Sequence, residues 1–109
     1  MAGAKVVVLY PTPRDAAAFE RAYREEHTPM VTPKSFPGMT RFVAVKVVGT
    51  PGGGPAPYAR IAELHFPSLQ ALQTGASSEG AKRAVEHAMS ISTGGAPVFL
   101  VCEEETTTF

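Results

Sequence analysis

The sequence has a single cysteine, no surplus of either charge and no long apolar stretch. Ten basic residues balance ten acidic ones, so no overall field attracts nucleic acid or an anionic membrane surface. Arginine and lysine form no cluster, and no aromatic residues alternate with basic ones. No segment reaches the roughly 20 apolar residues of a membrane-spanning helix. Nucleic-acid binding and membrane insertion are therefore not expected.

Cys102 has no second cysteine with which to form an intrachain disulfide, a pattern typical of a reducing compartment. It lies in the apolar run VFLVC, where a buried apolar role is more usual than that of a nucleophile. The opening segment MAGAKVVVLYP lacks the charged region, long apolar region and cleavage site of a signal peptide. We therefore expect a cytoplasmic protein.

The composition that remains is that of an ordinary globular chain. With 109 residues, 44% of them apolar and 18% charged, the chain has the size of one domain, which we expect to span residues 1–109. Its first segment, KVVVLY at 5–10, is β-branched or aromatic and predicts a strand buried on both faces. A helix is expected next, with Thr12 as its cap and Asp15 completing a capping box.

This helix carries an aromatic stripe that ends in a histidine. Phe19, Tyr23 and His27 recur every four residues, so they share one face if the helix persists that far. Pro29 disfavours helical geometry at Thr28, which places His27 in the last turn.

The rest of the chain predicts three further strands and a helical region. Residues 40–49 and 58–66 are apolar runs separated by the flexible loop GTPGGGPAP, which indicates an antiparallel hairpin. Serine caps predict helices over 69–75 and 77–90, and a last strand begins at 98. The order strand, helix, strand, strand, helices, strand predicts an α+β, ferredoxin-like fold: a four-stranded antiparallel sheet with helices on one face.

The strands are apolar on both faces, but helices can cover only one face of such a sheet. An uncovered second face would expose a larger apolar patch than monomers usually tolerate. We therefore expect a homodimer, sheet against sheet, with two-fold symmetry. Any space left between the two sheets would form a pocket for a small apolar molecule.

The chain resembles the EthD family, within the larger group of dimeric α+β barrels. The resemblance covers nearly the whole chain in order, and it implies the fold, the homodimer and a loose oxidoreductase activity in bacterial breakdown of ethers, beside a cytochrome P450 system. Relatives in the wider group include cofactor-free monooxygenases, cyclases, decarboxylases and isomerases, which place small, mostly apolar substrates inside the barrel. The segments that carry it are KVVVLYPTPRDAAAFERAYREEHTPMV, with its helix ending in His-x-Pro, then FPGMTRF, YARIAELHFPSLQALQ, SSEGAKRA and STGGAPVFLVCEE.

His27 is the first candidate catalytic residue. It is either a general base or acid at the mouth of the barrel, since an imidazole titrates near neutral pH, or a structural residue that bonds to the last carbonyls of its helix. The His-x-Pro of the family falls on His27, Thr28 and Pro29, which adds weight to the functional role. The structural role is still favoured, because the sequence fixes no partner that would position a base.

Glu63 and His65 are the second catalytic candidates. They are two residues apart in a predicted strand, so their side chains leave the same face. If Leu64 and Phe66 pack under the helices, both look into the barrel, where a carboxylate is a candidate for proton abstraction. The alternative is a structural pairing with one of three basic residues, namely Arg41, Lys46 and Arg60.

Three tyrosines are candidates for binding substrate. Tyr10 and Tyr58 lie near strand ends, where a phenol could orient a ligand oxygen, and Tyr23 lies on the stripe of His27. His87, on the last helix, is expected on the solvent side. No ligand spacing supports a metal site, and no nucleotide-binding fingerprint is present, so no metal or other cofactor is expected.

Three functions stay open from the sequence. The first is a cofactor-free enzyme, of oxidoreductase, monooxygenase or proton-transfer type, that acts on a small apolar or aromatic metabolite such as an ether. The second is a non-catalytic protein that binds such a compound or delivers it to a partner oxygenase. The third is a structural dimer with a filled interior.

Overall fold

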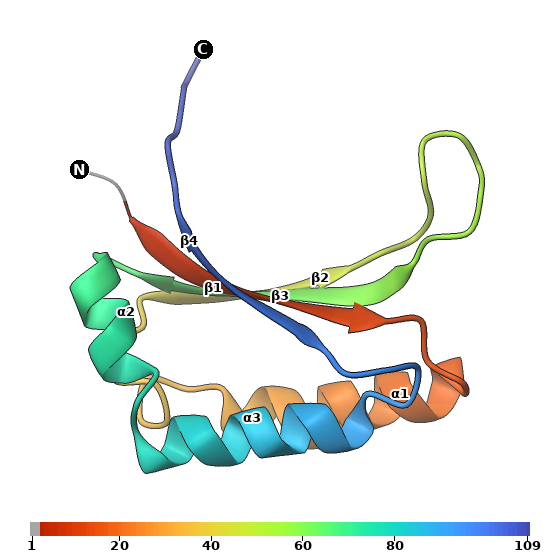
Figure 1. Ribbon diagram of the computed structural model, residues 1–109, viewed down its shortest axis with the longest axis horizontal. Helices are drawn as coiled ribbons and strands as arrows, with labels where there is room; N and C mark the ends of the chain where they lie inside the picture. Colours follow the sequence, from red (N-terminus) through yellow and green to blue (C-terminus); the bar gives the residue numbers. More distant parts are fainter. Residues whose placement is uncertain (1–2) are drawn as a thin grey trace.

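The computed structural model describes residues 3–109 and shows an antiparallel sheet with helices on one face (Figure 1). Residues 1–2 of the expected domain lie outside this part. The strands lie side by side in the order β2-β3-β1-β4, which confirms the predicted ferredoxin-like arrangement. Their bounds are Ala4–Pro11 for β1, Arg41–Lys46 for β2, Tyr58–Phe66 for β3 and Val98–Glu103 for β4.

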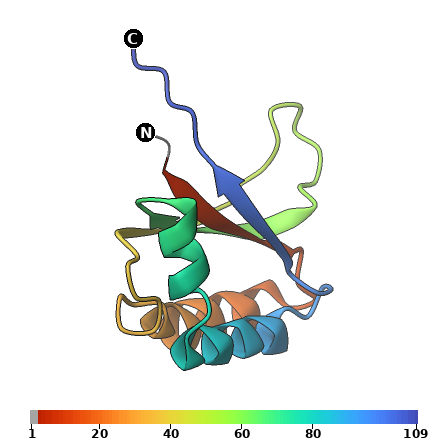
Figure 2. The ribbon, with the colours of Figure 1, turned by 60° about the vertical axis from the view of Figure 1, so that its left-hand side comes forward.

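The helices form a second layer beneath the sheet. Helix α1 continues directly into a π-helix, η1, and then into a 3₁₀ turn, η2. Figures 1 and 2 show α3 running beside the α1–η1 segment, with α2 at one end of the sheet. None of the helices in residues 3–109 has the length and apolar character to cross a membrane. The bounds are Ala16–Ala22 for α1, Tyr23–His27 for η1, Thr28–Met30 for η2, Leu69–Gly75 for α2 and Glu79–Ile91 for α3.

The cap of the first helix differs from the prediction. The Asp15 carboxylate accepts a hydrogen bond from the Ala18 N–H at 3.0 Å and is the N-cap. Thr12 is too far along the chain from Ala16 to cap it, and its hydroxyl instead donates to the Ala56 carbonyl at 2.9 Å. Thr12 therefore ties the start of the helical layer to the loop between β2 and β3.

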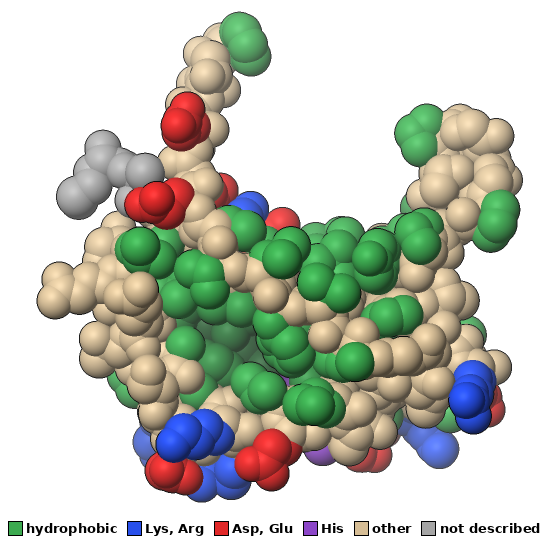
Figure 3. All heavy atoms as spheres, in the orientation of Figure 1, with side chains coloured by type: hydrophobic (Ala, Val, Ile, Leu, Met, Phe, Trp, Pro, Cys, Tyr) green, Lys and Arg blue, Asp and Glu red, His purple; other side chains and the backbone are tan. Residues whose placement is uncertain are grey.

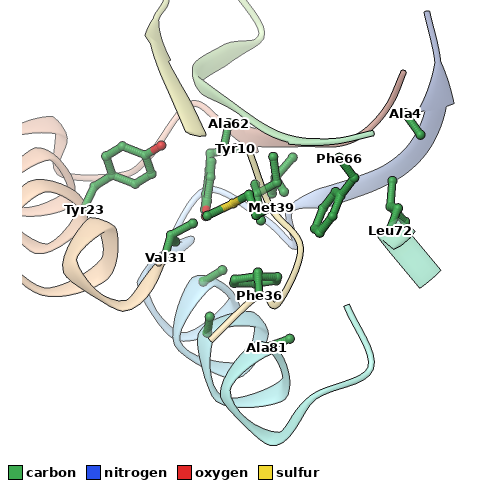
Figure 4. Packing of buried hydrophobic residues seen from close by; sticks show 14 of the residues in the cluster. Ala4, Tyr10, Tyr23, Val31, Phe36, Met39, Ala62, Phe66, Leu72 and Ala81 are labelled. Carbon is green, nitrogen blue, oxygen red and sulfur yellow. The ribbon is translucent and has the colours of Figure 1, made fainter. Parts of the chain in front are cut away.

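The register of the strands decides which side chains face the helices. Val8 lies opposite Ala62, and Val6 lies opposite Leu64; cross-strand partners of this kind share a face. These side chains belong to the core or pack against it. Figure 4 shows part of this core, including Ala62 from the sheet and Ala81 from α3. The buried apolar residues are Ala4, Val8, Tyr10, Phe19, Tyr23, Val31, Phe36, Met39, Ala62, Leu64, Phe66, Leu72, Ala81, Ala84 and Ala88.

The opposite face of the sheet has no helix over it. Leu9, Ile61 and Val45 are paired in the register across three strands and form its centre, and Leu100 is 46% exposed on the outer strand. Hydrophobic side chains gather along this upper side in Figure 3. The prediction that the strands are apolar on both faces is therefore confirmed. Strand β2 is shorter than expected, because Val48 already belongs to the loop and is 93% exposed.

Candidate functional site

The aromatic stripe of the first helix is present and ends at His27. The rings of Phe19 and Tyr23 are stacked with centroids 5.7 Å apart, and those of Tyr23 and His27 are 5.8 Å apart. In an α-helix of 3.6 residues per turn, side chains four residues apart drift around the axis. The helix widens at Tyr23, whose carbonyl accepts from the N–H of Thr28, five residues later. Because this turn contains more residues than an α-helical turn, it offsets the rotation and keeps the three rings in one column.

Tyr10 brings a hydroxyl from the sheet to this column. Its ring packs edge-on against Tyr23 at 5.4 Å, and its hydroxyl lies 3.2 Å from His27 Nε2. Burial raises the pKa of Tyr10 well above its ordinary value, so the phenol remains protonated. Two of the expected site residues, one from β1 and one from η1, are thus in direct contact.

His87 completes the group, although it was expected on the solvent side. Its Nδ1 lies 3.1 Å from Nδ1 of His27, and the two rings are parallel within 7° at a centroid distance of 5.2 Å. The prediction was wrong because α3 lies beside η1. His87 is next to the buried face of α3, and its side chain therefore contacts η1 instead of solvent alone. The position of His87 between Ala84 and Ala88, both buried, is the signal in the sequence that indicates this.

The surroundings keep His27 neutral. Burial, together with the neighbouring His87, lowers the pKa of His27 to about 4. At neutral pH the ring therefore carries one N–H and one free lone pair. Such a ring can accept a proton or a hydrogen bond at one nitrogen while it donates from the other.

Tyr10 and His27 line a cavity that is otherwise apolar. The cavity has a volume of about 40 Å³ and lies between the sheet and the helices. Its lining includes Phe99 of β4 and Val85 of α3. Figure 3 shows a hollow lined with hydrophobic side chains between sheet and helix. The remaining lining residues are Val6, Val8, Val31, Phe36, Phe42, Ala62, Leu64, Ala84 and Ala88.

Tyr23 has a different environment from Tyr10. The Arg60 guanidinium lies 4.9 Å from the centre of its ring and makes two hydrogen bonds to Glu20, at 2.9 and 2.7 Å. These hydrogen bonds lower the pKa of Glu20. The Tyr23 hydroxyl is buried without a hydrogen-bond partner among the described residues, and burial raises its pKa to about 12. Tyr23 is thus the central ring of the column, and it does not line the cavity.

Glu63 and His65 lie on the opposite face of the sheet from His27. Leu64 and Phe66 pack under the helices, so their neighbours point to the uncovered face, as expected. There His65 contacts Glu63 at 2.9 Å and Glu104 at 3.2 Å. The structure therefore does not bring the three catalytic candidates together.

The polar groups of the uncovered face are paired with one another. Lys5 Nζ lies 3.2 Å from Glu63 and 3.5 Å from Glu104, and Arg41 Nη2 lies 3.3 Å from His65 Nε2. Burial opposes the ionised form of Glu63, yet hydrogen bonds from His65 and Lys5 hold its pKa below the ordinary value. Of the three basic residues named for the structural alternative, Arg41 is the one that contacts this pair, through His65.

Tyr58 lies apart from both groups. It opens β3 opposite Pro11 and borders a shallow surface depression made by Thr12 and the loop between β2 and β3. Within residues 3–109, no three His, Cys, Asp or Glu side chains converge in a way that could hold a metal ion.

Comparison with known proteins gives consistent matches. A family model described as the EthD domain matches residues 12–89. An uncharacterized 11.0 kDa protein in the thcB-thcC intergenic region of Rhodococcus erythropolis is 36% identical over 101 residues, which are 92% of this chain and 94% of that protein.

Two solved structures extend the likeness to the fold. An EthD family protein from Bacillus halodurans is similar with a TM-score of 0.84 and 25% identity, over 96% of this chain and all (100%) of the other. A dimeric ferredoxin-like protein of unknown function from Jannaschia is similar with a TM-score of 0.70 and 18% identity, over 95% and 99% of the two chains.

Proposed function

Because the chain belongs to the EthD family, we propose that it binds a small apolar or aromatic molecule bearing one hydroxyl or carbonyl group. The observation that carries this proposal is the contact between Tyr10 and His27 at the wall of an otherwise apolar cavity. Apolar walls supply affinity, and a few polar groups in such a site fix the orientation of the ligand. The Tyr10 hydroxyl can both donate and accept a hydrogen bond; its contact with His27 uses one of these capacities and leaves the other for the ligand.

The proposed site lies between sheet and helices rather than between two sheets. The polar side chains of the uncovered face, Glu63 and His65, are occupied by ionic partners, whereas the cavity under the helices holds the Tyr10–His27 pair. The homodimer remains part of the proposal, because a second copy would cover the uncovered apolar face. The description of the Jannaschia protein as dimeric supports it.

The proposed chemistry is proton transfer to neutral His27, without a cofactor. Such a step would leave the substrate as an anion, which in a cofactor-free oxidoreductase or monooxygenase-type reaction itself gives electrons to oxygen. The substrate would be a hydroxyl- or carbonyl-bearing compound related to ethers, in line with the activity that the family name suggests. The lowered pKa of His27 favours an alternative in which the protein binds without turnover. In that case the Tyr10 oxygen, whose own proton is donated to His27, accepts a hydrogen bond from a compound that a partner oxygenase transforms.

Phenol and toluene form a matched pair of probes, because they share a benzene ring that carries a hydroxyl group in phenol and a methyl group in toluene. We expect phenol to bind more tightly and to shift NMR resonances of Tyr10, His27 and other cavity residues. Tyr10→Phe should weaken phenol binding by about fivefold, the equivalent of one hydrogen bond of about 1 kcal/mol, and should leave toluene unaffected. Tyr58→Phe, which removes a hydroxyl outside the cavity, is the control.

Two outcomes separate the proposal from its rivals. If phenol and toluene shift only resonances of the uncovered face, or neither binds, the cavity is not the site. Oxygen uptake with phenol and with ethyl tert-butyl ether then distinguishes the two functions: uptake that disappears in His27→Gln and persists in His65→Gln supports an enzyme. Binding without uptake supports the carrier.

A further inference from the structure

We propose that Tyr10, His27, His87 and Glu26 form one chain, of two hydrogen bonds and an outer ion-pair contact, that carries a proton between the cavity and the protein surface. Successive atoms are 3.2 Å apart from Tyr10 Oη to His27 Nε2, 3.1 Å apart from His27 Nδ1 to His87 Nδ1, and 3.5 Å apart from His87 Nε2 to Glu26 Oε1. Each imidazole thus uses both of its nitrogens. We call these four residues the relay.

Exposure rises steadily along the relay. Tyr10 is 1% exposed and His27 is 5% exposed, whereas the side chains of His87 and Glu26 are 23% and 64% exposed. The inner end lies at the cavity and the outer end in water. Proton movement requires a path of titratable side chains that joins an enclosed polar group to solvent. If these residues served only to pack the aromatic column, no such path would be needed.

The outer carboxylate sets the direction of the hydrogen bonds at neutral pH. Ionised Glu26 can only accept, so His87 carries its proton on Nε2 and has a free lone pair on Nδ1. His27 must then donate from Nδ1, which leaves its Nε2 free to accept from the Tyr10 hydroxyl. One arrangement of protons satisfies all three contacts.

Protonation of His87 reverses that arrangement. The imidazolium donates from both nitrogens, so Nδ1 of His27 becomes the acceptor and the His27 proton moves to Nε2. His27 then donates to Tyr10 instead of accepting from it. The protonation state of a surface-linked histidine thereby decides whether the cavity offers a proton acceptor or a proton donor.

This reversal gives His27 a way to act although burial disfavours its cation. A ligand hydroxyl would give its proton to Tyr10 as the Tyr10 proton moves to His27 Nε2, and the Nδ1 proton of His27 would move to His87. The ligand keeps the electron pair of its broken O–H bond, and the displaced proton leaves from His87 past Glu26 to water. This use of the relay rests on the proposed function, while its hydrogen-bond order does not.

Within residues 3–109, the titratable groups that contact the two rings come from β1 and η1. Tyr10 approaches from β1, and Tyr23 and Glu26 belong to η1 itself. Arg60 of β3 lies behind the Tyr23 ring, where it is paired with Glu20. The state of His87 therefore controls the direction of the hydrogen bond at His27.

Histidine ¹⁵N NMR of the ligand-free protein tests the proposal, and three histidines make assignment simple. Above neutral pH we expect His27 with its proton on Nδ1 and His87 with its proton on Nε2. On acidification, the His27 proton should switch to Nε2 together with protonation of His87. If His27 already carries its proton on Nε2 above neutral pH, or does not switch, the relay is wrong.

Variants separate the relay from simple packing. His87→Phe keeps a ring but removes the acceptor, so the His27 proton should move to Nε2 at all pH values. His87→Gln offers an amide oxygen and should retain the Nδ1 proton, but the acid-induced switch should be lost. His65→Gln, on the other face of the sheet, should leave both properties unchanged. An unaltered His27 in His87→Phe would overturn the proposal.

Solvent exchange of the buried His27 N–H proton tests conduction itself. We expect this exchange to become severalfold slower in His87→Gln, because the amide cannot pass a proton on. A merely loosened structure would exchange faster, and that result would overturn the relay. All these measurements use protein without ligand, so failure of phenol to bind would count against the proposed function and not against the relay.

Discussion

Among single residues, His27 shows most clearly how burial controls chemistry. Its pKa is about 4 in the folded protein because burial and the neighbouring His87 disfavour the cation, against about 6.5 in an unfolded chain. Below pH 6.5 the unfolded chain therefore binds more protons than the folded one. The free energy of unfolding consequently falls as pH drops from about 6.5 toward about 4.

Replacement of His27 by phenylalanine should remove this acid sensitivity. Between pH 7.5 and pH 5, we expect the wild type to lose about 2 kcal/mol more of its free energy of unfolding than His27→Phe loses. Urea denaturation at the two pH values measures this difference. The lowered pKa values of Glu20 and Glu63 act mainly at lower pH and equally in both proteins. Identical losses in the two proteins would contradict the account of His27.

At the scale of elements, close contacts between segments explain why certain positions hold glycine, which helix propensity and backbone conformation alone do not explain. Gly75 ends α2 as the sequence predicts, yet its backbone is not in the left-handed region that a glycine cap usually serves. It is needed for space: an added Cβ would collide with the Pro37 carbonyl oxygen and lie 2.7 Å from the Phe66 ring. The end of α2 thus packs tightly against both the loop before β2, at Pro37, and the end of β3, at Phe66.

Gly75→Ala should therefore destabilise the fold even though alanine favours helices. We expect a loss of about 1–3 kcal/mol in the free energy of unfolding, as for overpacked cores, measured by urea denaturation. Gly52→Ala is the matched control, because an added Cβ there meets nothing within 4 Å. If Gly75→Ala is as stable as the control, the neighbouring segments can move to accommodate the added methyl group, and the predicted steric cost is wrong.

At the scale of the whole molecule, one face of the sheet presents apolar side chains that no helix covers. Ile61 lies at its centre, paired with Leu9 on one side and Val45 on the other. Exposed apolar side chains continue on this face along β4, where Val98 and Leu100 lie opposite Leu9 and Val7 and are 38% and 46% exposed. Monomers rarely expose an apolar surface of this kind, which supports the proposed homodimer, in which a second copy covers this face by two-fold symmetry.

Light scattering should find dimers in the wild type at micromolar concentration and single chains in Ile61→Lys. A lysine at the centre of the interface would bury an unpaired charge, which is costly. Ala17→Lys, which adds the same charge at an exposed position of α1, should leave the dimer intact. Single chains in the wild type would refute the proposed homodimer.

Much of the fold follows from local patterns in the sequence. The runs at 58–66 and 69–75 coincide with β3 and α2, because period-two alternation and a serine cap act within a few residues. The four-residue spacing of the aromatic column is likewise local. Even the existence of an unsatisfied apolar face can be predicted, since it depends only on which side chains alternate along each strand.

The partners of polar side chains are decided by the tertiary structure. Strand register, a long-range property, separates His27 from Glu63 and His65 by the thickness of the sheet, whereas the sequence treats them as one group of candidates. The packing of α3 beside η1 brings His87 to within 3.1 Å of His27, across 60 residues of chain. Hydrogen bonds and pKa values depend on distances of a few ångströms, and only the folded chain determines those between residues far apart in sequence.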